Sequence, residues 1–180
     1  DDGGWLQRYP YLSASFDAES SRLTAEGDGG GASLAFGEQW FAMPVGPEHE
    51  RLRAGAVYAG AVGDHAYPPE AEGRIVAVTS GPGLGMEIFT EIGYAVQSGA
   101  AGLLIILSPA IPSEAIPSIA GQVRGLPAQD IPVLGVLRSA AADLFSAAGQ
   151  EIDLVAPVEG SGTPMELGVD LTVQVAMDRE

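Results

Sequence analysis

Gly73-Arg74-Ile75-Val76-Ala77-Val78 opens the part of the sequence that decides the fold. Its last four residues form a short apolar run rich in β-branched side chains, which is typical of a buried strand. Residues 86–98 then carry apolar side chains at helical spacing, and Gly99 is placed as a C-terminal stop. A second buried strand follows at Leu103-Leu104-Ile105-Ile106-Leu107. Strand, helix and strand at this spacing predict a right-handed parallel crossover.

Upstream of this unit the sequence predicts further strands. Residues 22–25 and 33–36 alternate apolar and polar side chains around the glycine-rich turn at residues 27–31, so they predict a loose hairpin. Residues 40–43 end at a proline and form a candidate short strand. Residues 54–62 are small and apolar, and they predict another strand.

Downstream, residues 109–127 predict a proline-punctuated loop with a helical turn near 118–123. Residues 131–137 predict a strand. Ser139 is a plausible N-cap for a helix over 140–148, which Gly149 closes. Two further segments alternate well enough to be antiparallel closing strands: Ile152–Val155 and Val169–Val175.

The composition narrows the classes of partner. The chain has 180 residues, 24 acids and 8 bases, and a net charge of −16. All eight bases are arginine. Such a surface repels nucleic acid and anionic membranes, so we expect neither as a partner. The absence of cysteine excludes disulfides, thiolate nucleophiles and cysteine-bound metals.

The order of these elements resembles the protease-associated (PA) domain family. Five segments agree with that family in order and spacing: Gly73–Val78, the helix to Gln97, Ser98–Ile106, Ile131–Val136 and Ser139–Leu144. The resemblance covers residues 54–149. Upstream, residues 36–44 and 56–60 look like the start of such domains in bacterial zinc aminopeptidases. The chain departs from the family at Arg74, where lysine is common, and at Glu87 and Glu91, where a base often appears.

The resemblance implies a fold and a role. The fold is a mixed α/β, α+β-type open barrel or sandwich of about seven strands, with two to three flanking helices and one βαβ crossover. We expect one domain over 1–180, with an N-terminal extension and hairpin start at 1–31 and closing strands at 150–180. The implied role is a non-catalytic accessory domain of a larger secreted or periplasmic metallopeptidase. Its partners would be the catalytic domain and peptide or protein substrates, and zinc would be bound only in that catalytic domain. A subtilisin-like host is an alternative.

The residues themselves offer little for catalysis. Only His49 and His65 could act as imidazole ligands, and each has carboxylates beside it in the sequence. We interpret both as exposed loop histidines, because groups adjacent in sequence seldom converge on one ion. No Gly-x-Ser-x-Gly elbow occurs, and two histidines leave little scope for a Ser–His–acid triad. We therefore expect no catalytic, metal or cofactor site in this chain.

Two loops are candidate binding segments. Gly81–Gly85 follows a predicted strand and precedes a helix, as a phosphate-binding loop does. A small-ligand or nucleotide-binding domain is therefore the alternative function. Against it, Met86 stands where Gly-x-Gly-x-x-Gly needs glycine, and Glu87 would repel phosphate. The aliphatic residues of 109–127 could contact a partner or fold back onto the core. The candidate partner-contact residues are Pro82, Leu84, Ile111, Ile116 and Ile119.

Overall fold

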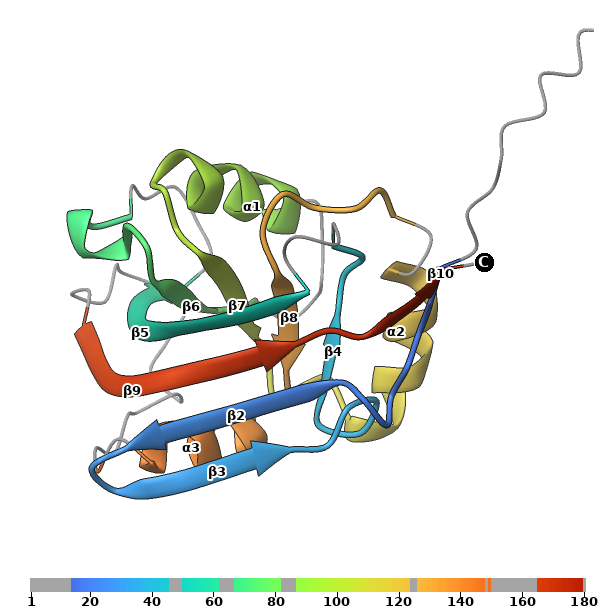
Figure 1. Ribbon diagram of the computed structural model, residues 1–180, viewed down its shortest axis with the longest axis horizontal. Helices are drawn as coiled ribbons and strands as arrows, with labels where there is room; N and C mark the ends of the chain where they lie inside the picture. Colours follow the sequence, from blue (N-terminus) through green and yellow to red (C-terminus); the bar gives the residue numbers. More distant parts are fainter. Residues whose placement is uncertain are drawn as a thin grey trace, which may run out of the picture.

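The computed structural model describes residues 14–45, 50–61, 67–81, 87–123, 126–147, 149 and 165–179. These residues build an eight-stranded mixed sheet in the order β3-β2-β9-β5-β6-β7-β8-β4, with a separate two-stranded sheet, β1-β10 (Figure 1). The strands of the large sheet are β2 Arg22–Gly27, β3 Gly30–Leu34, β4 Trp40–Ala42, β5 Arg51–Ala61, β6 Ile75–Thr79, β7 Gly102–Ile106, β8 Val133–Val136 and β9 Met165–Gln174. The small sheet pairs β1 Ala14–Phe16 with β10 Met177–Arg179.

One half of the large sheet is parallel. Strands β5, β6, β7 and β8 run side by side in the same direction. Helix α1, Glu87–Gln97, connects β6 to β7, which confirms the predicted parallel crossover. Helix α2, Ile116–Val123, connects β7 to β8 after a 3-10 turn at Ser113–Ala115. The predicted number of crossovers, one, was therefore too small, because the proline-rich segment contains the helix α2, which forms a second crossover.

The other half of the large sheet is antiparallel. The predicted hairpin is present as β2 and β3, with Gly27 paired to Gly30. Its second strand spans Gly30–Leu34 instead of residues 33–36, because most of the glycine-rich segment belongs to the strands. Strand β9 lies between β2 and β5 and pairs antiparallel with both. The predicted closing strand at residues 169–175 therefore lies inside the sheet and begins earlier, at Met165. The other predicted closing strand, residues 152–155, lies outside the described residues.

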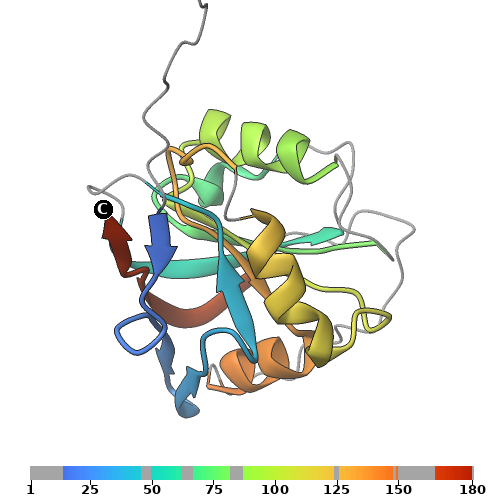
Figure 2. The same cartoon turned by 90° about the vertical axis from the view of Figure 1, so that its right-hand side faces the viewer.

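The period of two along the strands divides the interior into two cores. In β6, Ile75 and Ala77 belong to one core, while Val76 and Val78 belong to the other. Helix α3, Arg138–Ser146, covers the first core through Leu144 and Phe145, and it contacts β2 and β3. Helices α1 and α2 cover the second core. Figure 2 shows α1 and α3 on opposite sides of the strands.

Helix α3 begins before the position that the sequence indicates. Its N-cap is Leu137, which makes no side-chain capping bond, and the Ala141 amide donates to the Leu137 carbonyl at 2.8 Å. Ser139 therefore lies in the first helical turn and is not the cap. The predicted stop is in place, since Gly149 follows the helix with a φ of 72°.

Candidate functional site

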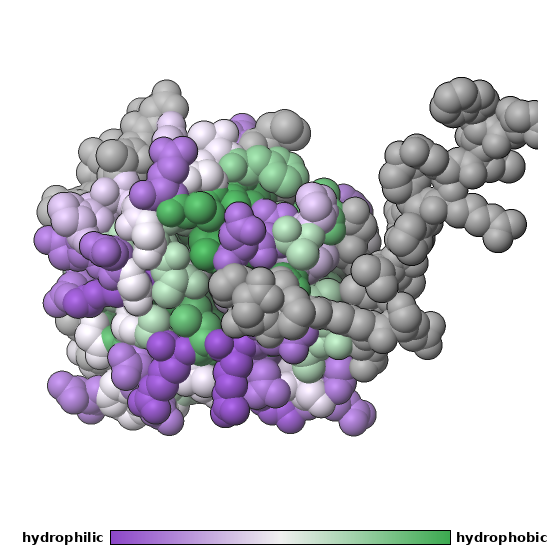
Figure 3. Space-filling model, turned by 45° about the horizontal axis from the view of Figure 1, so that its top comes forward, coloured by the Kyte–Doolittle hydropathy of each residue, from purple (hydrophilic) through white to green (hydrophobic). Residues whose placement is uncertain are grey.

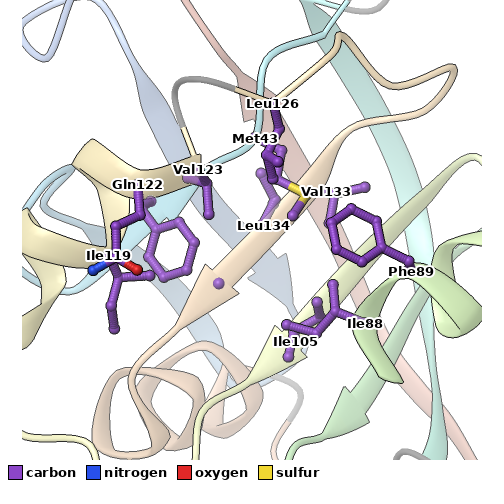
Figure 4. Close-up of a pocket in the computed structure, with 12 residues that line it drawn as sticks. Met43, Ile88, Phe89, Ile105, Ile119, Gln122, Val123, Leu126, Val133 and Leu134 are labelled. Atoms are coloured by element: carbon purple, nitrogen blue, oxygen red, sulfur yellow. The ribbon is translucent and has the colours of Figure 1, made fainter. Parts of the chain in front are cut away.

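An apolar groove separates α1 from α2 on the second core. It encloses about 260 Å³ and crosses β8, with α1 on one side and α2 on the other (Figure 4). Helices and strands contribute the following lining residues: Phe41, Met43, Ile88, Phe89, Ile105, Ile119, Gln122, Val123, Leu126, Val133, Leu134 and Gly135. We call this hollow the α1–α2 groove.

The floor of the α1–α2 groove depends on a close contact between neighbouring strands. Phe41 in β4 lies opposite Gly135 in β8. A Cβ atom on Gly135 would lie 2.2 Å from Cζ of Phe41, so the ring occupies the space that any other residue would fill. The glycine lets the aromatic ring lie against the sheet and cover the floor. Because these residues are 94 positions apart, the sequence alone could not show the contact.

The rim of the α1–α2 groove exposes apolar surface. Phe89 on α1 is 42% exposed, although Ile88 beside it is buried. Figure 3 turns the top of the Figure 1 view toward the reader and shows hydrophobic residues gathered among hydrophilic ones on that side. Among the described residues of the lining, Gln122 on α2 is the one with a polar side chain. A solvent-facing aromatic ring at the edge of an apolar hollow is typical of a binding surface.

The chemistry of this lining suits recognition rather than bond cleavage. In the part of the lining that the structure describes, no residue carries a carboxylate, an imidazole or a hydroxyl. Pockets for drug-sized ligands enclose roughly 300–1,000 Å³, so about 260 Å³ suits a single large side chain. The groove can therefore bury an apolar group, and the Gln122 amide can donate or accept a hydrogen bond at its edge.

A buried polar pair lies on the inner side of α1. Glu91 is 1% exposed and accepts a hydrogen bond from the Tyr67 hydroxyl. Burial of the phenol, reinforced by the hydrogen bond and the charge of Glu91, raises the pKa of Tyr67 far above its ordinary value of 10.0. The Tyr67 ring also lies edge-on to Tyr94 at 6.5 Å between ring centroids. These contacts fix α1 against the segment that precedes β6.

Hydroxyl groups gather where the parallel strands end. The Tyr58 and Thr79 hydroxyls hydrogen-bond at 2.8 Å, and the Ser108 amide donates to Ser80 Oγ at 3.1 Å. The loop Gly81–Gly85 starts here, but only Gly81 belongs to the described residues. A second, open hollow of about 440 Å³ lies near this edge, lined by Ser108, Pro109, Ile111, Ser113, Leu137, Arg138 and Ser139.

The predicted contact residues have different surroundings. Ile119 lines the α1–α2 groove, and the half-buried Ile111 lines the second hollow. Ile116 is 0% exposed, so at this position the segment folds back onto the core and the side chain is not a surface contact. Pro82 and Leu84 lie outside the described residues. Sequence reasoning missed Phe41, Phe89 and Gly135.

The described residues offer no site for zinc. No group of three or more His, Asp or Glu side chains that could hold a metal ion occurs among them. The two histidines considered as ligands, His49 and His65, lie outside the described residues. No helix in the described part of the chain has the length and apolar character needed to cross a membrane.

Comparisons with known proteins identify a fold but not a family. No family model and no curated protein sequence matches the chain. The structure resembles that of BSAP, a zinc aminopeptidase from Bacillus subtilis, with a TM-score of 0.50 and 16% identity. The match covers 92% of this chain but 33% of the aminopeptidase chain. A second structure of BSAP gives a TM-score of 0.49 at 16% identity, with 92% and 34% coverage. The chain thus spans about a third of the aminopeptidase, and at this identity the likeness concerns the fold.

Proposed function

We propose that this chain is a PA-type accessory domain of a zinc peptidase, which controls substrate access or contacts other proteins. The observation that carries the proposal is the partial match, in which 92% of this chain corresponds to one third of a zinc aminopeptidase. A chain that reproduces one third of a peptidase fits a domain attached to the catalytic part. The five segments in the order of the PA family independently support the same role.

The α1–α2 groove provides a means of recognition for such a domain. Its lining is apolar, and an exposed aromatic ring, Phe89, stands at its rim. Burying an apolar side chain there removes it from water, which stabilises the complex without a chemical step. In this proposal the peptidase catalytic domain and peptide or protein substrates are the partners. Zinc is bound in the catalytic part of the longer protein, and the protein acts outside the cytoplasm.

An assay of the isolated chain tests the non-catalytic part of the proposal. The chain is incubated with zinc and a panel of aminoacyl chromogenic substrates. We expect no turnover above a zinc-only control. Turnover that disappears in His49→Ala or His65→Ala would contradict the proposal.

The neighbouring coding sequence identifies the host enzyme. We expect His, Asp and Glu residues with zinc-ligand spacing on one or both sides of this segment. A Ser–His–Asp set there would indicate a subtilisin-like host instead. The alternative nucleotide-binding function predicts that millimolar nucleotide raises the melting temperature of the isolated chain, whereas an accessory domain predicts no shift.

A further inference from the structure

We propose that the α1–α2 groove binds one large apolar side chain of a peptide that carries a positive charge next to that side chain. The inference deepens the proposed function and rests on it, because it takes a peptide as the ligand. It commits to a cationic, apolar peptide and not to a second copy of the chain.

The volume of the groove sets the size of the anchor. About 260 Å³ between the two helices accommodates a leucine or an aromatic side chain but not several residues. The floor, formed by Phe41 over Gly135, is closed by the sheet, so the anchor enters from the side of Phe89 and Ile119. At the edge, Gln122 offers an amide to the peptide backbone.

The charged residues around the groove determine which sign of charge a ligand should carry. Glu87 is the one exposed carboxylate among the described residues of α1, α2, β4, β7 and β8, and these residues include no arginine. Glu91 on α1 is buried and bonded to Tyr67, so it does not face the groove. Glu87 is exposed and adjoins the two α1 residues that line the groove. Arg124, which follows α2 in the sequence, lies outside the described residues.

Two arginines that form ion pairs lie away from the groove. Arg53 contacts Glu26 and Asp170, and Arg74 contacts Glu166, so both belong to the β5–β9 side of the sheet. With its net charge of −16, this chain attracts cations to the open groove. A cation beside the anchor therefore adds attraction, whereas a carboxylate there meets repulsion.

The same charge argues against a second copy as the occupant. Two chains of net charge −16 repel each other, and the groove presents no described base to offset this. Another occupant would be the N-terminal segment of the chain itself, residues 1–13, which contains Trp5, Leu6, Tyr9, Tyr11 and Leu12. Deletion of residues 1–13 and light scattering distinguish both occupants from the peptide.

Fluorescence anisotropy with short labelled peptides tests the proposal on the whole chain. One probe carries a single leucine flanked by two lysines, the second replaces the leucine with serine, and the third replaces both lysines with glutamate. We expect the first probe to bind with a Kd on the order of 10⁻⁵ to 10⁻³ M, because one anchor must offset the cost of association. The other two should bind at least about 10-fold more weakly.

Two matched variants localise the binding. Phe89→Ala removes an exposed ring that lines the groove, whereas Val96→Ala removes an exposed side chain two turns further along α1. The exposed fractions are 42% for Phe89 and 41% for Val96, so neither change should unfold the protein. We expect Phe89→Ala to raise the Kd of the first probe about 5- to 10-fold, and Val96→Ala to change that Kd less than about 2-fold.

Several results would overturn the proposal. These are no binding of the first probe at millimolar concentration, equal binding of the glutamate probe, or equal losses in the two variants. Binding that appears only when residues 1–13 are deleted would identify that segment as the occupant. A loss of binding caused by dimerisation, detected by light scattering, would identify a second copy. Each result is independent of the zinc assay and the neighbouring sequence, so this inference can fail while the accessory role stands.

Discussion

Replacing Gly135 with alanine tests the packing that forms the floor of the α1–α2 groove. The new Cβ would lie 2.2, 2.4 and 2.9 Å from Cζ, Cε1 and Cε2 of Phe41. Carbon atoms in contact lie about 3.5–4.0 Å apart, so the ring must retreat by more than about 1 Å. The sheet blocks the inward direction, and the ring can move only into the groove. We expect a loss of about 1–3 kcal/mol in the free energy of unfolding, which is typical of overpacking.

A double-mutant cycle measured by urea unfolding shows whether this contact is the cause. Phe41→Leu removes the three ring atoms that the new methyl would strike, because leucine ends at the position of the ring Cδ atoms. In that background Gly135→Ala should cost less than about 0.5 kcal/mol. Gly93→Ala on α1 is the control, since its Cβ would meet no atom within 4 Å and should raise stability by about 0.5–1 kcal/mol.

Two results would contradict a steric clash between the new methyl group and the Phe41 ring. Gly135→Ala could leave the urea midpoint unchanged, which would mean that the ring does not rest on the glycine. It could also cost the same with leucine at position 41, which would place the strain elsewhere. The retreating ring also occupies the groove, so Gly135→Ala should weaken the leucine–lysine probe as well.

Three further substitutions probe other parts of the structure. The raised pKa of Tyr67 means that the folded state keeps a proton that the unfolded chain releases near pH 10.0, so stability falls as pH rises through that value. Between pH 10 and 11, the free energy of unfolding of Tyr67→Phe should fall by about 1 kcal/mol less than that of the wild type. Thermal unfolding at the two pH values measures this difference. Trp40→Phe should cost about 1–3 kcal/mol in urea, since it leaves the buried Leu34 carbonyl without its 3.2 Å donor. Arg53→Ala should cost less than about 1 kcal/mol, because its side chain is 61% exposed; a larger loss would contradict this.

The local elements of the parallel half could be predicted from the sequence. The apolar runs of β6 and β7 and the periodicity of α1 each identify one element without reference to the rest of the chain. The glycines of the β2–β3 hairpin do the same. These elements could be predicted because each depends only on residues that are close to one another in the sequence.

The sequence did not predict the full length of helix α2, because the helix contains a proline. Pro117 suggested a loop, but it occupies the second residue of the helix, where its missing amide hydrogen costs nothing because that position has no partner within the helix. The alternation of β9 was visible, but its place between β2 and β5 was not, because pairing over such distances leaves no local signal. The α1–α2 groove depends on both kinds of information, since it needs α2 and the contact of Phe41 with Gly135.

The most direct test of the accessory role uses the full gene product that contains this chain. Its kcat/KM is measured in zinc for a polypeptide substrate and for an aminoacyl chromogenic substrate, in the wild type, Phe89→Ala and Val96→Ala. We expect zinc-dependent hydrolysis of both substrates. In Phe89→Ala we expect a several-fold loss of kcat/KM for the polypeptide that exceeds any loss for the small substrate, and in Val96→Ala we expect no change. A gene product without peptidase activity would contradict the accessory role, and equal losses for both substrates would contradict substrate recognition by the groove.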